Sequence, residues 1–175
     1  MSNNMNNNMS NKMQSYDIII LGSGMVGSAL ACALAKTNLR IALLDKQKPQ
    51  LDWPLEGYDL RVSALTYASQ NILDHMGVWP GILKRRVTPF TRMHVWDATG
   101  NGAVKFDAED SGIPQLGHIV ENRATQGALF DYFMSYNNID YLEPVTVTKV
   151  ITDEDKVKLS LADGRCLQAK LIVGA

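Results

Sequence analysis

A glycine-rich turn near the start of the chain has the clearest chemistry. It follows an apolar run and reads Gly22-Ser23-Gly24-Met25-Val26-Gly27, a Gly-x-Gly-x-x-Gly pattern. Its first glycine lets the chain turn sharply off a strand, its second leaves room for a pyrophosphate, and its third lets a helix pack closely on the sheet. The N–H groups at the start of that helix favour phosphate. We therefore expect ligand contacts from Gly22, Gly24, Met25, Val26 and Gly27.

An acidic residue follows the turn at the spacing that a dinucleotide site requires. The run Arg40-Ile41-Ala42-Leu43-Leu44 ends in Asp45, about twenty residues after the glycines. A carboxylate at the end of a second strand can accept hydrogen bonds from both ribose hydroxyls, and it repels a 2′-phosphate. The pattern predicts a βαβ unit in which Asp45 and its neighbour Lys46 contact the ligand. The alternative is a glycine-rich turn in an unrelated α/β protein.

The composition suits one ordinary soluble domain and gives no charge excess for binding nucleic acid. The 175 residues are 46% hydrophobic and carry a formal net charge of -1. The positive run at 84–86 reads as a solvated helix end or, alternatively, as a contact with anionic lipid. No metal-ligand or catalytic spacing links the cysteines and histidines, which read as structural residues: Cys32, Cys166, His75, His94 and His118. We expect a reducing compartment, no metal and no catalytic side chain.

The remaining sequence divides into a leader, helices and irregular segments. Residues 1–13 form a leader rich in Asn, Met and Ser that should be disordered, and the ordered domain covers 14–175. The helix after the glycine turn should end at Asn38, a residue that tolerates left-handed backbone. Residues 46–60 should form an irregular surface segment.

Two more helices and several strands are expected further along the chain. Apolar spacing predicts a helix over 63–76, with Ser63 as N-cap and Gly77 directly after its end, and another over 122–136. Alternating apolar residues predict a hairpin formed by 93–97 and 103–106. They also predict two short strands at 118–120 and 139–142, and a final meander over 145–173 that ends in a buried strand.

The order of further motifs points to a known family. The motifs are Asp59-Leu60-Arg61-Val62-Ser63-Ala64-Leu65 with Ser69, then Gly77-Val78-Trp79, then Val120-Glu121-Asn122-Arg123 followed by Leu129. With the glycine turn, they resemble the flavin-dependent aromatic hydroxylases of ubiquinone biosynthesis, relatives of the p-hydroxybenzoate hydroxylase group. The resemblance implies an α/β fold, a Rossmann-like ββα FAD-binding domain with antiparallel β insertions. The family's Asp-Gly motif should follow Ala175, so 14–175 would be the N-terminal portion of that domain.

The resemblance also implies which residues hold the FAD cofactor. It places Arg61 on the FAD, where a guanidinium can bridge phosphate oxygens in a fork that lysine cannot reproduce. It places Arg123 near the flavin nucleotide and the backbone of Val147 near the adenine. Asp59 would be a turn residue or a contact near the adenosine ribose. Without the resemblance, both arginines read as surface residues.

The implied activity is that of an FAD-dependent monooxygenase with NAD(P)H as co-substrate. The flavin would be reduced by NAD(P)H, and O₂ would supply the oxygen transferred to the ring of a polyprenylated phenol. We expect a cytoplasmic protein, peripheral at the inner face of the membrane, with no nucleic acid partner and a place in a ubiquinone-biosynthesis complex. The 175-residue chain alone should be inactive.

Three other functions compete with this interpretation. They are another FAD-dependent oxidoreductase, a nicotinamide-dependent dehydrogenase and a non-catalytic nucleotide-binding fragment. The dehydrogenase is disfavoured because 93–106 and 145–173 read as antiparallel β insertions rather than as alternating strands and helices. The fragment stays an alternative because the family's Asp-Gly motif is absent from these residues.

Overall fold

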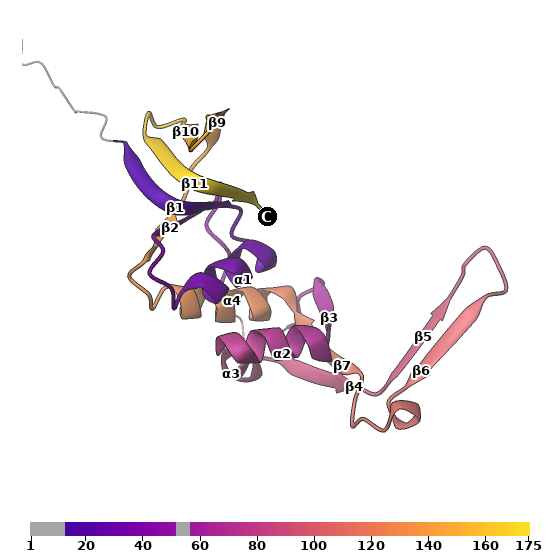
Figure 1. Ribbon diagram of the computed structural model, residues 1–175. Coiled ribbons are helices and arrows are strands. Elements are labelled where there is room, and N and C mark those ends of the chain that lie inside the picture. Colours follow the sequence, from indigo (N-terminus) through magenta and orange to yellow (C-terminus); the bar gives the residue numbers. More distant parts are fainter. Residues whose placement is uncertain (1–12, 52–56) are drawn as a thin grey trace, which may run out of the picture.

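A six-stranded sheet forms the centre of the protein in a computed structural model that describes residues 13–51 and 57–175 (Figure 1). Apart from Met13, the leader expected over 1–13 lies outside the described residues. Four neighbouring strands are parallel, and the last two form an antiparallel meander. From edge to edge the strands are β8 (Ile139–Leu142), β2 (Ile41–Leu44), β1 (Gln14–Leu21), β11 (Cys166–Gly174), β10 (Val157–Leu161) and β9 (Val147–Thr152).

Strand β1 is apolar on both faces because each face is covered. Ile19 and Ile20 are both fully buried, but alternation along the strand sends them to opposite sides of the sheet. Ile20 packs in the core that the helices cover, whereas Ile19 packs with Leu159 and Leu167 of the meander. This continuous burial explains the unbroken apolar run that precedes the glycine turn.

Helices cover one face of the main sheet (Figure 1). Helices α1 and α4 pack against each other, and α2 and the short helix α3 lie beyond them. Phe133 and Leu129 of α4 and Ile82 of α3 are fully buried between these layers. The bounds are α1 (Met25–Leu34), α2 (Tyr67–Met76), α3 (Trp79–Leu83) and α4 (Asn122–Phe133).

A second, antiparallel sheet brings together two segments that are distant in sequence, the loop before β3 (Val62–Thr66) and the start of α4. Its order is β3, β7 (Gly117–Glu121) and β4 (Val87–Phe90). Because β7 is central, Val62 of β3 lies opposite Glu121, and the loop before β3 therefore runs beside the start of α4. From this sheet the hairpin of β5 (Arg92–Trp96) and β6 (Ala103–Asp107) projects away from the rest of the protein, followed by η1 (Glu109–Ser111) (Figure 1).

Most of the predicted elements are confirmed. The βαβ unit, the hairpin within 93–107, the strands at 117–121 and 139–142, and the final meander are all present. Gly77 ends α2 in a left-handed conformation with φ 90°, as expected of a residue that follows a helix. The described parts of 46–60 contain no helix or strand, and 52–56 lie outside the described residues.

The helix predicted over 63–76 is wrong in its first turn. Residues 62–66 form strand β3, and the N-cap is Thr66, whose Oγ1 accepts a hydrogen bond from Ser69 N at 3.4 Å. Ser63 instead donates to Asn122 Oδ1 at 2.6 Å. Pairing with β7 satisfies the backbone groups of 62–66, and this tertiary contact outweighs the helical spacing of the apolar residues.

Two other helix boundaries and the burial of one strand also differ from the prediction. Helix α1 ends at Leu34, where the backbone and side chain of Thr37 both donate to the Leu34 carbonyl, and Asn38 has no left-handed backbone. Helix α4 ends at Phe133 rather than at 136. The strand at 171–173 is present but not buried: Leu171 is 51% exposed, because no described element covers its side chain.

Two glycines of the turn should respond to alanine with stability losses of different size. A Cβ on Gly27 would lie 1.9 Å from the Gly22 carbonyl oxygen, whereas a Cβ on Gly24 would meet nothing within 4 Å. Gly27→Ala should lower the free energy of unfolding by about 1–3 kcal/mol through overpacking. Gly24→Ala, the matched control, should cost less than about 1 kcal/mol, the scale of an N-cap change. Urea denaturation measures both, and equal losses would contradict the packing role of Gly27.

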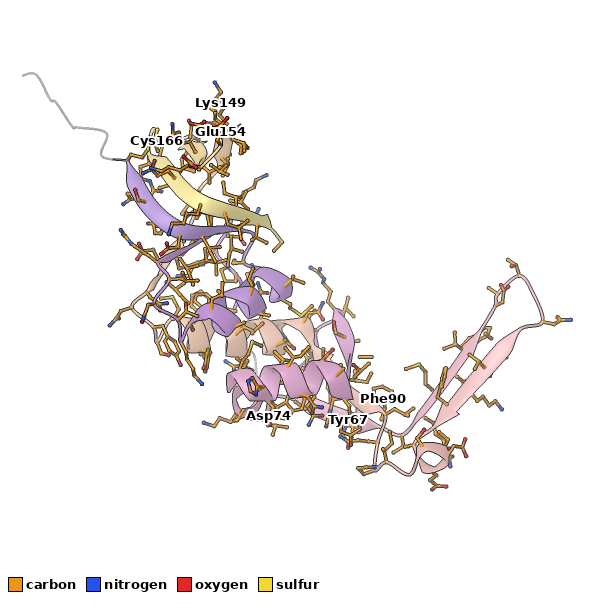
Figure 2. The ribbon with its side chains drawn as sticks, viewed as in Figure 1. Tyr67, Asp74, Phe90, Lys149, Glu154 and Cys166 are labelled. Atoms are coloured by element: carbon orange, nitrogen blue, oxygen red, sulfur yellow. The ribbon has the colours of Figure 1, made fainter. Side chains whose placement is uncertain are left out.

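The two cysteines should differ in reactivity towards an alkylating reagent. Cys32 is 2% exposed, and burial raises the pKa of its thiol to about 12. Cys166 is half-buried at the beginning of β11 (Figure 2). With iodoacetamide at pH 8, Cys32 should react on the order of a hundredfold more slowly than Cys166. Mass spectrometry of the Cys166→Ala variant isolates Cys32, which should be labelled only after denaturation; rapid labelling of the native variant would contradict its burial.

Candidate functional site

Two pockets lie at the carboxyl ends of β1 and β2. The larger, of about 640 Å³, is termed the glycine-turn pocket, and its walls come from the turn, segment 45–50, residues 59 and 61 and the first turns of α4. The smaller, of about 370 Å³, is termed the strand-end pocket and lies between the ends of β1 and β2 and the beginning of β9. Asp45 lines both pockets. They are therefore neighbouring parts of one site.

The structure brings together most of the residues that the sequence singled out. The glycine-turn pocket is lined by Gly24, Met25, Asp45, Arg61 and Arg123. The strand-end pocket is lined by Gly22, Asp45, Lys46 and Val147. Two predicted residues lie outside both pockets: Gly27 packs beneath the turn, and Val26 is 72% exposed.

The three glycines of the turn have different surroundings. Gly22 adopts φ 109°, and a Cβ on it would lie 2.2 Å from the Ala175 carbonyl oxygen. Gly27 touches the Gly22 carbonyl, so the first turn of α1 lies directly against the end of β1. Gly24 alone faces open space at the pocket wall. This geometry leaves room for a diphosphate beside the backbone at the start of α1, and the residues present therefore fit an adenine dinucleotide.

Asp45 is held by hydrogen bonds from the glycine turn and from its own loop. Its Oδ2 accepts from Ser23 N at 2.7 Å and from Ser23 Oγ at 2.5 Å, and its Oδ1 accepts from Gln47 N at 3.1 Å. Burial by itself raises the pKa of this carboxyl, but these hydrogen bonds outweigh burial and lower the pKa below its usual value. Asp45 is therefore an ionised acceptor at neutral pH.

A buried carboxylate organises the arginine side of the site. The side chain of Glu121 is only 5% exposed, and its Oε2 accepts from Arg123 Nη2 at 2.8 Å and Nε at 3.1 Å. Its Oε1 accepts from Arg86 Nη1 at 3.1 Å. Arg123 also lies 3.9 Å from Asp59 Oδ2. Glu121 thus fixes the guanidinium of Arg123 at the pocket wall.

The same carboxylate anchors the loop that carries Arg61. The backbone N–H of Asp59 donates to Glu121 Oε2 at 2.7 Å, and Arg86 donates to the Gly57 carbonyl at 2.7 Å. Asp59 Oδ1 in turn accepts from the backbone N–H of Arg61 at 3.0 Å. The Arg61 side chain itself is exposed and lines the pocket, and it forms no ion pair with another described residue. A fixed backbone therefore presents a guanidinium that is available to a ligand.

Besides Glu121, to which no role was assigned from its motif, sequence reasoning missed two residues that build this site. Ser23 has no assigned role in the glycine motif, although it bonds Asp45 with both its amide and its hydroxyl. Gln126 lines the glycine-turn pocket and donates to the Ser23 carbonyl at 3.0 Å. Its position three residues after Arg123, on the same face of a helix, was the available signal.

The positive run at 84–86 is mostly used within the protein. Arg85 donates to the Gly81 carbonyl and pairs with Asp131 at 2.8 Å. Arg86 bonds Glu121 and lies over the Tyr58 ring, 4.3 Å from its centroid. The two arginines therefore have structural roles that neither a solvated helix end nor a lipid contact anticipated.

Two further features of the described residues bear on function. No helix within 13–51 and 57–175 has the length and hydropathy needed to cross a membrane. In the same ranges, no group of His, Cys, Asp and Glu side chains could hold a metal ion.

Known proteins share this sequence over nearly its whole length. Residues 20–50 match the family described as NAD(P)-binding Rossmann-like domain. The chain is 32% identical over 162 residues to 3-demethoxyubiquinol 3-hydroxylase of Escherichia coli, covering 93% of this chain and 41% of that protein. It is 33% identical over 159 residues to ubiquinone hydroxylase UbiL of Rhodospirillum rubrum, covering 91% and 36%. It is 31% identical over 175 residues to the mitochondrial ubiquinone biosynthesis monooxygenase COQ6 of Homo sapiens, covering 91% and 37%.

Solved structures share the fold at lower sequence identity. The p-nitrophenol 4-monooxygenase PnpA of Pseudomonas putida superposes with a TM-score of 0.71 at 16% identity, covering 93% of this chain and 41% of that one. The flavin-dependent monooxygenase PieE, solved with FAD and substrate, gives 0.71 at 14% identity, covering 92% and 30%. The chain spans 41% or less of the length of the three hydroxylases compared above. The chain is thus a homologue of the ubiquinone-biosynthesis hydroxylases, with the fold of flavin-dependent monooxygenases.

Proposed function

We propose that this chain is the adenosine-diphosphate-binding part of an FAD-dependent monooxygenase. One observation carries the proposal: Asp45 lies between two pockets, beside the open backbone at Gly24. An adenosine diphosphate needs this arrangement, because its ribose lies between its adenine and its phosphates. The homology to ubiquinone hydroxylases supports FAD as the dinucleotide.

Each group of site residues has its own task in holding FAD. Gly24 and the N-terminus of α1 would bind the pyrophosphate, and Arg61 and Arg123 would offset its charge. Asp45 would bind the ribose, while Lys46 and Val147 would line the adenine side. Bound FAD supplies the redox chemistry, and the protein supplies binding and orientation. The N–H dipoles at the start of α1 and the two guanidiniums would stabilise the negative charge of the bound phosphates.

The homology supports a more specific activity for the complete enzyme. We infer the hydroxylation of a polyprenylated phenol ring in ubiquinone biosynthesis, with NAD(P)H and O₂ as co-substrates. The relatives' names support this substrate class. A substrate of this kind is lipid-soluble, which supports peripheral contact of the complete enzyme with a membrane.

Blocking the backbone at Gly24 should strongly weaken nucleotide binding without unfolding the protein. A valine side chain there would enter the space left for the pyrophosphate, while its backbone, at φ -62°, suits any residue. In isothermal titrations of the 175-residue chain, Gly24→Val should weaken FAD and ADP binding at least about tenfold. The matched control Val26→Ala alters an exposed side chain outside both pockets and should bind normally. Unchanged dissociation constants for Gly24→Val would refute the proposed site.

Neutralising Glu121 should weaken both the fold and FAD binding. Glu121→Gln keeps the side-chain shape but places an NH₂ group where one carboxylate oxygen accepts three donors, from Arg123 and the Asp59 amide. We expect a loss of about 2 kcal/mol in the free energy of unfolding, the scale of a hydrogen bond to a charged group. FAD affinity should fall because Arg123 and the Arg61 loop lose their anchor.

The control for Glu121 is Asp131→Asn, which removes an exposed carboxylate from its pair with Arg85. That change should cost less than about 1 kcal/mol, as is typical of surface ion pairs. Thermal unfolding and FAD titration measure the two effects separately. Normal FAD affinity in a folded Glu121→Gln variant would show that the arginines do not depend on Glu121 for binding.

A further inference from the structure

Every polar group of Ser23, a residue of the glycine turn, has a hydrogen-bond partner elsewhere in the structure. It is 2% exposed, and both its amide and its hydroxyl contact Asp45 Oδ2. Its hydroxyl also lies 3.3 Å from the phenol oxygen of Tyr141 on β8. A serine hydroxyl has one proton to donate, and an ionised carboxylate has none. Ser23 therefore donates to Asp45, and Tyr141 donates to Ser23.

The backbone carbonyl of Ser23 is held as firmly as its side chain. It accepts from Ser28 Oγ at 2.9 Å and from Gln126 Nε2 at 3.0 Å. These donors belong to α1 and α4, so two helices fix the peptide from which the Ser23 side chain extends. The ring of Tyr141 is itself packed edge-on against Phe130, with the ring centroids 5.3 Å apart.

This arrangement limits what Asp45 can still accept. Oδ2 already takes two donors, which use both of its in-plane lone pairs. Among the described residues, Oδ1 accepts a hydrogen bond of ordinary length from Gln47 N, at 3.1 Å, and keeps one lone pair; the Lys46 amide acts on the carboxyl more weakly. That oxygen belongs to a residue that lines both pockets. Asp45 is therefore set to receive one further donor rather than two.

We propose that Ser23 is a positioning residue, which fixes Asp45 so that its Oδ1 accepts a hydrogen bond from one ribose hydroxyl of the bound adenine nucleotide. The inference rests on the proposed function and narrows it: the carboxylate binds one hydroxyl and not both. A carboxylate already held in its binding orientation loses little freedom when the ligand arrives. Tyr141 extends the same chain of hydrogen bonds by one step.

The test compares three nucleotides with the 175-residue chain: ADP, 2′-deoxy-ADP and 3′-deoxy-ADP. Ser23→Ala should weaken ADP binding by about tenfold in isothermal titration. The same substitution should change the affinity by less than about twofold for the one deoxynucleotide that lacks the hydroxyl bound by Asp45. Asp45→Asn should show the same dependence on that hydroxyl. A merely structural role for Ser23 would weaken all three nucleotides alike.

Two more variants complete the design. Ser28→Ala removes a hydrogen bond to the Ser23 carbonyl without touching Asp45, and it should leave the ratio between the three affinities unchanged. Tyr141→Phe keeps Ser23 and removes only the outer donor, so it should give a smaller selective loss of about threefold. If thermal unfolding shows that Ser23→Ala does not fold, Tyr141→Phe becomes the variant that tests the positioning role of Ser23.

The outcomes separate this inference from the proposed function. If the unchanged chain binds ADP but Ser23→Ala loses affinity equally for all three nucleotides, or loses none, the inference is overturned and the nucleotide site stands. An unselective or absent effect of Tyr141→Phe, where it is the deciding variant, overturns the inference in the same way. If the unchanged chain binds no ADP, both fail.

Discussion

The close approach of helix α1 to the end of strand β1 is the constraint on which the site depends. Gly27 lies against the Gly22 carbonyl, and Gly22 lies against the backbone of Ala175 at the end of β11. No side chain fits at either point. The contact sets the N-terminus of α1 above the strand ends and places Ser23 beside Asp45. The pocket beside Gly24 exists because the turn is held on both sides by close backbone packing, at Gly22 before it and at Gly27 after it.

A second organising element is the buried carboxylate of Glu121. It lies at the end of β7, the central strand of the small antiparallel sheet, and it receives donors from the Arg123 side chain, Arg86 and the Asp59 backbone. An unpaired buried carboxylate would be costly, so the presence of these partners is a condition of its burial. The same contacts hold two pocket arginines at positions that main-sheet packing alone would not define.

Local sequence patterns failed at three places, for three different physical reasons. The spacing of Leu65 with later apolar residues fits a helix, yet 62–66 pair with β7 as a strand. Asn38 could end a helix, but Thr37 closes α1 earlier by bonding the Leu34 carbonyl. The apolar run at 171–173 reads as buried, although the described residues leave Leu171 half exposed. A distant strand decided the first case, a neighbouring threonine the second, and the absence of a covering element among the described residues the third.

The sequence by itself determined the glycine turn, the strand–helix–strand unit and the acidic residue after the second strand, because these depend on local backbone geometry and apolar periodicity. It also indicated Arg61 and Arg123, through motifs whose order resembles a family. Only the tertiary structure decided that Ser23, Gln126 and Glu121 belong to the site. Their roles come from contacts between β1, β2, β7, α4 and the loop before β3. Such contacts depend on how the elements pack in three dimensions, which the spacing of residues along the chain does not specify.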